Sequence, residues 1–345
     1  MAQQAPLRAA LAGALATTTT PHQRMQTRYI ARFLAQRIGT ALILLGLISF
    51  GTFALLALAP GDPIDVLLAG KRRTPEIVAS LESTYHLSGS FIDRYLGWAA
   101  AALQFDFGQS ISQREPVIDQ ILERAPITLQ LAGMAFVLVL AIGIPLGVAA
   151  AVLRGRGSDR AIVAGTVVGI SMPPFVTGIL LIYLFAVTLN VLPSFGPGSP
   201  GSERFTHLLL PALALAFTAL AIVVKVTRTA MIRELEQDYV IFAQARGYST
   251  LTVLVRHALR NALIPVVTAS GLVLGYMVGG AVLVEQVFSL PGLGSLLVEA
   301  AEGRDLPTLQ GVVLVIAIVI ILLNLLTDLL YLAIDPRVRF GEVTE

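Results

Sequence analysis

Six apolar runs, each long enough to cross a lipid bilayer, constrain what this chain can fold into. They extend over about residues 38–59, 128–153, 161–189, 207–224, 263–284 and 309–334. A helix needs about 20 apolar residues to span the hydrocarbon core, where every backbone polar group must be hydrogen-bonded within the protein. Only 13% of the residues are charged, against about 25% in soluble domains. We therefore expect an all-α polytopic membrane protein with six transmembrane helices.

Basic residues indicate which side of the membrane each connecting segment occupies. They gather before the first run, between the second and third, between the fourth and fifth, and after the last. Short segments rich in Lys and Arg stay in the cytosol. We therefore expect both termini to be cytosolic, together with the longest such segment, residues 225–262. The segment 61–127 is then expected on the outer side.

These expectations divide the chain into five parts. The parts are a disordered tail or misassigned start at 1–26, a first transmembrane helix at 27–60, an extracytoplasmic helical loop at 61–127, a core domain with five transmembrane helices at 128–335, and a cytosolic C-terminus at 336–345. Within the outer loop, Thr74 caps a helix that begins at Pro75. Apolar residues at helical spacing between Ile92 and Leu103 then predict an amphipathic helix.

Motifs for chemistry are absent. A phosphate-binding P-loop needs a Lys between Gly and Ser or Thr, but Lys71 is followed by Arg72 and Lys225 by Val226. The histidines are far apart, no HExxH or GxSxG occurs, and the chain has no cysteine. The dispersed basic residues form no stripe for nucleic acid. We expect no catalytic residue, no metal and no nucleic-acid partner, so that any ATP is bound by another subunit.

Glycines and one acid mark positions of interest inside the spans. Small-xxx-small spacing lets helices approach closely in lipid, and it occurs at Gly143 and Gly147, Gly165 and Gly169, and Gly271, Gly275 and Gly279. Helix packing is the simpler interpretation. The alternative, lining a pathway that changes width, is most plausible in the fifth run, because Gly279 and Gly280 are adjacent.

A carboxylate deep in the last run needs a partner. Asp328 lies four residues after Asn324, on the same helix face. A charge at this depth is costly unless it faces protein or water. We expect an ion pair with Lys225 or Arg228 at the end of the fourth run, the alternative being a carboxylate that reaches water.

The segment 225–262 predicts two short helices that face the cytosol. Acids precede Tyr239, favourable for a helix start, and Gly247 is a typical C-terminal cap. Ser249 or Thr250 caps a second helix, for which we expect one face formed by Leu251, Leu254, Val255, Ala258 and Leu259. Two angled helices held by two spans form a natural docking surface.

This segment also resembles a known family. DYVIFAQARGYSTLTVLVRHALRNALIPVV is similar to the cytoplasmic coupling loop of ABC-importer permeases, in the form of the dipeptide/oligopeptide/nickel branch. Other stretches resemble the same branch, namely APGDP at 59–63, FDFGQSI at 105–111, SMPPF at 171–175, GGAVLVEQVFSLPGLGSLLVEAAEGRDLPTLQG at 279–311 and NLLTDLLYLAIDPRVRF at 324–340. The match covers about residues 27–340.

The resemblance implies a fold, partners and site residues. The fold is that of a type I ABC importer permease in a prokaryotic cell membrane. The partners are a second homologous permease subunit, two cytosolic ATPase subunits that bind ATP and Mg, and an extracytoplasmic substrate-binding protein. The residues that enter an ATPase groove are Tyr239, Phe242, Ala243, Ala245, Arg246 and Gly247. The general permease pattern places Glu-Ala-Ala where this chain has Ile241, Phe242 and Ala243, so its acidic contact is not expected here.

Several alternatives remain open about substrate and class. The branch carries dipeptides, longer peptides, glutathione and nickel complexes, and peptide is favoured by frequency. Glu285 and Glu299 are candidates for contact with a peptide amino group, against a simpler role in capping outer helices. A stand-alone ion-coupled carrier would need titratable groups near the bilayer midplane. A membrane enzyme would need a nucleophile or metal cluster, which the sequence lacks.

Overall fold

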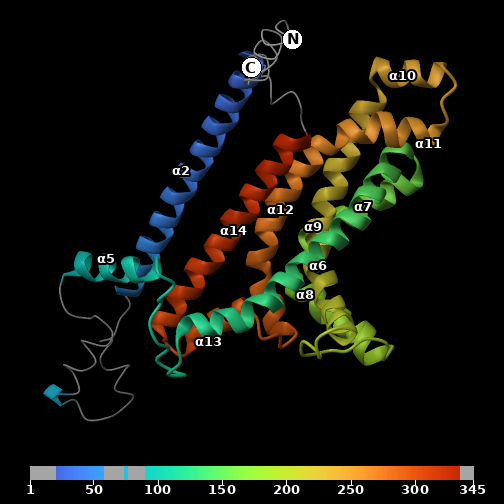
Figure 1. Ribbon diagram of the computed structural model, residues 1–345. Coiled ribbons are helices and arrows are strands. Elements are labelled where there is room, and N and C mark those ends of the chain that lie inside the picture. Colours follow the sequence, from blue (N-terminus) through green and yellow to red (C-terminus); the bar gives the residue numbers. More distant parts are fainter. Residues whose placement is uncertain (1–20, 58–73, 77–89, 335–345) are drawn as a thin grey trace, which may run out of the picture.

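The computed structural model describes residues 21–57, 74–76 and 90–334, and these residues form helices without a β-strand (Figure 1). Among them, five helices are long and apolar enough to cross a membrane. These are α2 (Pro21–Ala57), α6 (Val117–Val152), α9 (Ser202–Leu235), α12 (Arg260–Val287) and α14 (Leu306–Ile334). A bent pair of helices makes the sixth crossing if it is counted as one span. The expected all-α fold is confirmed.

The third apolar run, expected as one span, is divided by two prolines. Helix α7 (Gly157–Ser171) ends there. The next helix, α8 (Pro174–Leu181), starts at an angle of 108° to α7 and continues into the π-helical η1 (Ile182–Thr188). Proline has no N–H and disfavours helical geometry in the residue before it. Met172 accordingly has extended backbone angles, and Pro174 takes the first position of α8. The sequence Met172-Pro173-Pro174 therefore forces the break.

Helix α9 lies at the centre of the packed core. Leu210, Leu215, Ala219 and Val223 on α9 are fully buried in a cluster that includes side chains of α6 and α12. The expected close packing at glycines is confirmed between α6 and α9. A Cβ added at Gly147 would lie 2.5 Å from the Thr227 Cβ, so only glycine allows this approach.

Helix α2 stands apart from the core and is held by aromatic rings (Figure 1). At its far end, Phe50 and Phe53 make edge contacts with Phe91 and Tyr95 of α5 (Phe91–Ala102). The α5 helix confirms the amphipathic segment expected near Ile92. Its start is fixed by a capping box in which the Ser90 hydroxyl accepts from the Asp93 N–H. In the segment predicted to begin at Pro75, only residues 74–76 are described.

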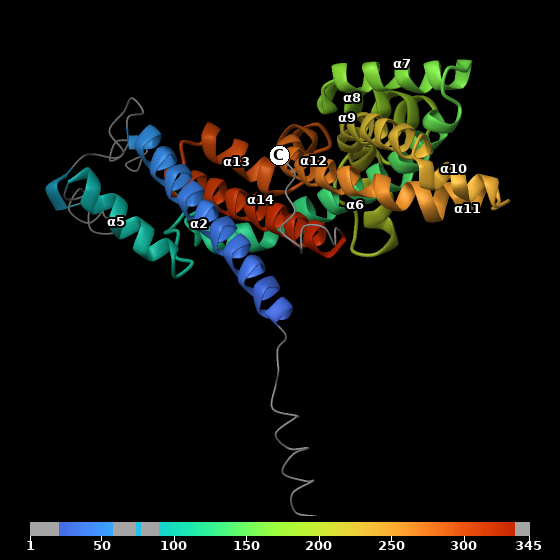
Figure 2. The ribbon, with the colours of Figure 1, turned by 90° about the horizontal axis from the view of Figure 1, so that it is seen from above.

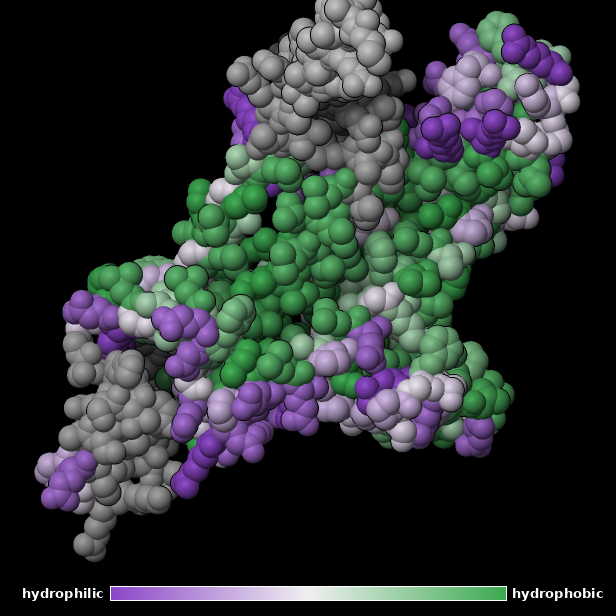
Figure 3. Space-filling view, viewed as in Figure 1, coloured by the Kyte–Doolittle hydropathy of each residue, from purple (hydrophilic) through white to green (hydrophobic). Residues whose placement is uncertain are grey.

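The helices define two ends of the molecule. One end carries α10 (Asp238–Ala245), α11 (Thr250–Thr252) and the π-helical η2 (Val253–Leu259), together with the start of α2 and the end of α14 (Figure 1). We call it the α10 end. The opposite α13 end carries α13 (Leu293–Glu302) and α5 (Figure 2). Figure 3 shows a hydrophobic band between polar ends, as a bilayer requires.

The expected part boundaries differ from the structure in two places. Helix α2 begins at Pro21, inside the segment 1–26 that was assigned to a tail, and residues 1–20 lie outside the described part. Helix α9 extends from Ser202 to Leu235 without interruption, so the first residues of segment 225–262 continue a spanning helix. The C-terminal segment 336–345 also lies outside the described part.

Candidate docking surface and pathway

The two short helices expected in segment 225–262 are present at the α10 end. Helix α10 extends from Asp238 to Ala245, and the chain leaves it through Gly247 with a φ of 82°. This left-handed conformation favours glycine, which confirms the predicted cap. Ser249 caps the next helix, because its hydroxyl accepts from the Thr252 N–H. Local caps thus fix the shape of the loop between α9 and α12.

Five of the six residues assigned to docking are exposed. Ala243 is the exception, because it is only 5% exposed and packs with Val240 and Val253. Its assignment to a partner contact was wrong, since its helix face is turned inward. Phe242 is 68% exposed and Ile241 52% exposed. The remaining exposed residues are Tyr239, Ala245, Arg246 and Gly247. The outer face of α10 thus presents apolar side chains on an otherwise polar end (Figure 3).

The hydroxyl group of Tyr239 joins three helices. It donates to the Glu234 carboxylate on α9 and accepts from the Asn261 Nδ2 of α12 at 2.8 Å. Helix α10 is therefore tied through one side chain to the spans on both sides of the loop. This contact could not be predicted, because helical spacing relates Tyr239 only to its near neighbours along the chain.

The expected face of the second short helix is confirmed in part. Ala258 is buried, and Leu254 and Leu259 pack against the same cluster. Leu251 and Val255 are exposed, and Val253 is buried instead. The predicted set assumed regular α-helical spacing. Residues 253–259 form a π-helical turn, which has more residues per turn and rotates the following side chains. The expectation was wrong only for Leu251 and Val255, for this reason.

The Asp328 ion pair forms with a different partner. Its carboxylate lies 3.0 Å from the Arg37 guanidinium of α2, which packs beside α14. Arg228 instead holds Asp159 of α7 with two bonds of 2.7 and 2.8 Å. Lys225 is exposed. The expected pairing with Lys225 or Arg228 was wrong, because α14 packs against α2 and α12 rather than against the end of α9.

The structure places Glu285 inside the protein and Glu299 at its surface. Glu285 on α12 is fully buried, and its carboxylate accepts from the Thr128 hydroxyl at 2.6 Å and from the Ser295 N–H at 3.0 Å. Thr128 in turn accepts from the N–H of Leu293. Glu285 therefore caps the start of α13 and joins it to α6, which contradicts contact with substrate. Glu299 is about half exposed and pairs with Arg124 at 2.8 Å.

The glycines of the fifth run have two different environments. A Cβ added at Gly271 would overlap Thr327 of α14, and one at Gly275 would make ordinary contact with Ile320. These two glycines belong to helix packing. A Cβ at Gly279 meets nothing within 4 Å. The structure therefore separates the packing glycines from Gly279, which borders open space.

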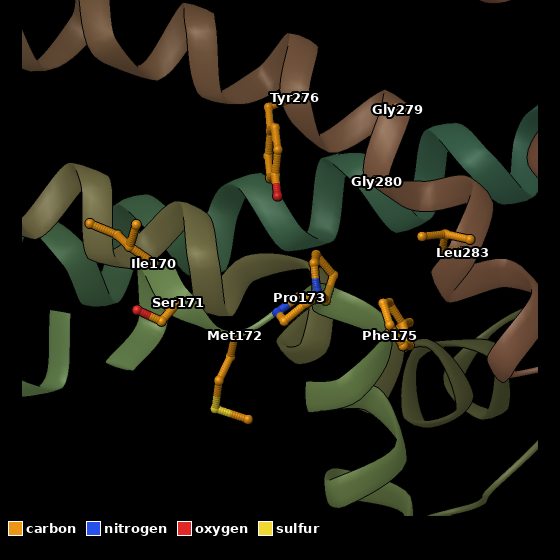
Figure 4. A pocket seen from close by; sticks show the side chains of 10 residues that line it. Ile170, Ser171, Met172, Pro173, Phe175, Tyr276, Gly279, Gly280 and Leu283 are labelled. Carbon is orange, nitrogen blue, oxygen red and sulfur yellow. The ribbon is translucent and has the colours of Figure 1, made fainter. Parts of the chain in front are cut away.

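A groove of about 530 Å³ lies where α12 crosses the break between α7 and α8 (Figure 4). One wall is the segment 170–175, and the other consists of Tyr276, Gly279, Gly280 and Leu283. The Tyr276 ring points from α12 toward the break, where Pro173 lies (Figure 4). The two glycines singled out for a pathway thus line a cavity.

A buried carboxylate at the α13 end carried no signal in the sequence. Asp305, just before α14, is 1% exposed and accepts from the hydroxyl of Ser110 at 2.5 Å and from the hydroxyl and N–H of Ser112 at 2.9 and 3.2 Å. Burial raises its pKa, but these hydrogen bonds and one from the Ile111 N–H outweigh burial and hold the pKa below its ordinary value. The FDFGQSI stretch is thereby fixed to α14.

Asp305 is expected to make the outer segment sensitive to acid. Its pKa is lower in the folded state than in the unfolded state, so it adds stability above its ordinary pKa of 3.8, and this is lost as pH falls through the lower folded value. Asp305→Asn should lower the free energy of unfolding by about 1–3 kcal/mol at neutral pH. It should also remove this pH dependence. Thermal unfolding of the purified complex between pH 6 and pH 3 measures both effects, and equal pH profiles would contradict the assignment.

Comparison with known proteins identifies the family. Residues 143–340 match the family model described as binding-protein-dependent transport system inner membrane component, and residues 30–132 match its N-terminal companion. A putative peptide transport system permease protein of Brucella melitensis is 39% identical over 92% of this chain and all of its own length. The dipeptide transport system permease protein DppB of Escherichia coli K12 is 36% identical over 89% of this chain and 98% of its own.

A solved structure shares the fold. The inward-facing MetNI methionine ABC transporter superposes with a TM-score of 0.54 at 19% sequence identity. The match covers 63% of this chain and 96% of that one. At this identity the likeness concerns the fold alone. Together, the family matches and the helical architecture show that this chain belongs to the binding-protein-dependent transport system inner membrane components, and that it is a multi-pass permease subunit of an ABC importer.

Proposed function

We propose that this chain forms half of the translocation pathway of an ATP-driven importer for dipeptides and oligopeptides. The proposal of peptide as substrate is supported by the names of the relatives from Brucella melitensis and Escherichia coli. The other half of the pathway is a second, homologous permease subunit. An extracytoplasmic binding protein delivers the peptide at the α13 end.

The energy comes from two cytosolic ATPase subunits that bind ATP and Mg and dock at the α10 end. The observation that carries this part is the apolar outer face of α10, where Ile241 and Phe242 are exposed. Exposed apolar patches on a polar surface mark interaction sites. Because the start of α2 and the end of α14 lie at this same end (Figure 1), both termini are cytosolic in the proposed orientation.

The chain contributes mechanical linkage and a passage, and no chemical step. ATP binding changes the ATPase groove, and the groove moves α10. Tyr239 joins α10 to Glu234 and Asn261, so that the displacement reaches α9 and α12 together. Coupling requires that ATPase contacts differ between the inward-open and outward-open states.

Reconstitution tests the proposed function. The chain is co-expressed with its partner permease, ATPase and binding-protein subunits, and the purified complex is placed in liposomes. We expect stoichiometric ATPase subunits and ATP-dependent uptake of radiolabelled dialanine that requires the binding protein. Uptake of glutathione or a nickel complex in place of peptides would overturn the substrate class. Ion-gradient-driven uptake by this chain without ATPases would overturn the importer mechanism itself.

A further inference from the structure

We propose that the groove at the break between α7 and α8 binds the amino terminus and amide groups of the peptide as it crosses the membrane. This inference rests on the proposed function, because it takes a peptide as the substrate. The ligand chemistry is a primary ammonium group with neighbouring amide N–H donors. Main-chain carbonyl oxygens at the end of α7 are the acceptors.

The break leaves carbonyl oxygens without donors. In a continuous helix, the carbonyls of Gly169 and Ile170 would accept from residues 173 and 174, but both are prolines and have no N–H. Among the described residues, no donor reaches the carbonyls of Gly169, Ile170 or Ser171. Ile170 and Ser171 are exposed, so inside a membrane their carbonyls need a donor from outside this part of the chain.

Neighbouring carbonyls at the same break do have donors. The Thr218 hydroxyl donates to the Met172 carbonyl at 2.9 Å, and the Thr177 hydroxyl donates to the Pro173 carbonyl at 3.3 Å. The protein therefore supplies side-chain donors on the side that faces α9 and α8. Ile170 and Ser171 line the groove instead. No donor among the described residues occupies their carbonyls.

The electrostatics of the break favour a cation. The C-terminal end of a helix carries a partial negative charge of about half an elementary charge. Broken spanning helices use such ends and unwound carbonyls to hold cations. The residues that line the groove include no charged side chain, so no fixed ion competes for this position. The ammonium group of a peptide carries the positive charge that the end of α7 favours, and it also has the N–H donors that the free carbonyls lack.

The other walls of the groove can accept peptide side chains of different kinds. Met172, Phe175 and Leu283 are apolar, and the volume of about 530 Å³ falls within the range of about 300–1,000 Å³ of small-ligand pockets. Only the Tyr276 and Ser171 side chains add hydroxyl groups, and the Ser171 hydroxyl donates to the Val167 carbonyl. Such a site recognises features that all peptides share and tolerates differences between their side chains.

A substitution at Gly279 tests this proposal, because the space beside this residue is open. Because a Cβ at Gly279 meets nothing within 4 Å, a larger residue there should enter the groove without disturbing the fold. In the reconstituted complex, Gly279→Leu is expected to lower uptake of diphenylalanine about tenfold or more relative to uptake of dialanine. Gly46→Leu, at an exposed glycine of α2 that also has open space, is the matched control and should leave both rates unchanged.

Cross-linking gives an independent result with the unaltered chain. Alanyl-4-benzoylphenylalanine, a photoreactive dipeptide, is expected to label residues 170–175 or 276–283 during turnover, with excess dialanine suppressing the labelling. Because the chain has no cysteine, Gly279→Cys also provides one unique thiol. Its cross-linking to the other permease subunit would show that a protein helix fills the groove.

The outcomes separate this inference from the proposed function. If the wild-type complex imports no dipeptide, the proposed function fails. If it imports both dipeptides but Gly279→Leu lowers both equally or neither, or if the photoprobe labels residues elsewhere, the groove assignment fails while the importer assignment stands.

Discussion

Replacing Gly247 with proline is expected to abolish peptide-stimulated ATP hydrolysis by the reconstituted importer while the chain still inserts into the membrane. Gly247 has a φ of 82°, and its N–H donates to the Gln244 carbonyl at 2.9 Å. Proline fixes φ near −65° and has no N–H, so α10 would lose both its cap and its orientation. Hydrolysis rates with and without the peptide-loaded binding protein provide the measurement.

A matched substitution controls for local strain. Gly155 has a φ of 80°, and its N–H donates to Asp159 at 2.9 Å, so Gly155→Pro imposes the same kind of damage outside the docking loop. We expect it to retain stimulated hydrolysis. Phe242→Glu provides a second variant, because this exposed side chain is not needed for folding. If Gly247→Pro and Phe242→Glu both hydrolyse ATP normally, α10 is not the docking element.

The second large effect is expected at Glu285. Glu285→Gln keeps the shape of the side chain but places an amide donor near the N–H of Ser295 or the hydroxyl of Thr128, both of which donate to the carboxylate. Leaving such buried donors without acceptors should lower the free energy of unfolding by about 3 kcal/mol. The loss would appear as a lower thermal midpoint of the detergent-purified complex. Substrate KM in the folded fraction should stay unchanged, because Glu285 is fully buried.

Glu299→Gln is the paired control. Its carboxylate is about half exposed and contacts Arg124, and exposed ion pairs contribute at most about 1 kcal/mol. The thermal midpoint of this variant should therefore change little. The structural role of Glu285 would be rejected if Glu285→Gln raised the KM for peptide while leaving the thermal midpoint unchanged.

Features set by local chemistry were predictable from the sequence. The thickness of the bilayer determines how long an apolar run must be, which gave the spanning helices. The caps at Gly247 and Ser249 follow from the conformations that these two residues favour. The packing glycines were recognised by their spacing, as the contact of Gly147 with Thr227 confirms.

Features that depend on which helices touch were not predictable. Several cations have similar depth in the membrane, so the sequence did not select Arg37 as the partner of Asp328. Glu285 was assigned to a substrate contact because of its position near the outer end of the fifth run. Its hydrogen bond with Thr128 joins residues that are far apart in the sequence, so it could not be predicted. The family resemblance also placed Ala243 on the docking face, although the packing of α10 on Val253 turns it inward. In each case the partner belongs to another helix.

The π-helical turn at residues 253–259 has a consequence for chain length. A π-turn is equivalent to one residue inserted into an α-helix. Removing one residue there would restore regular α-helical hydrogen bonding and rotate α11 relative to α12 by about 100°. The apolar face of α10 would then turn away from the direction that it faces now, although every docking side chain would still be present. Single-residue deletions in this short stretch should therefore uncouple the importer.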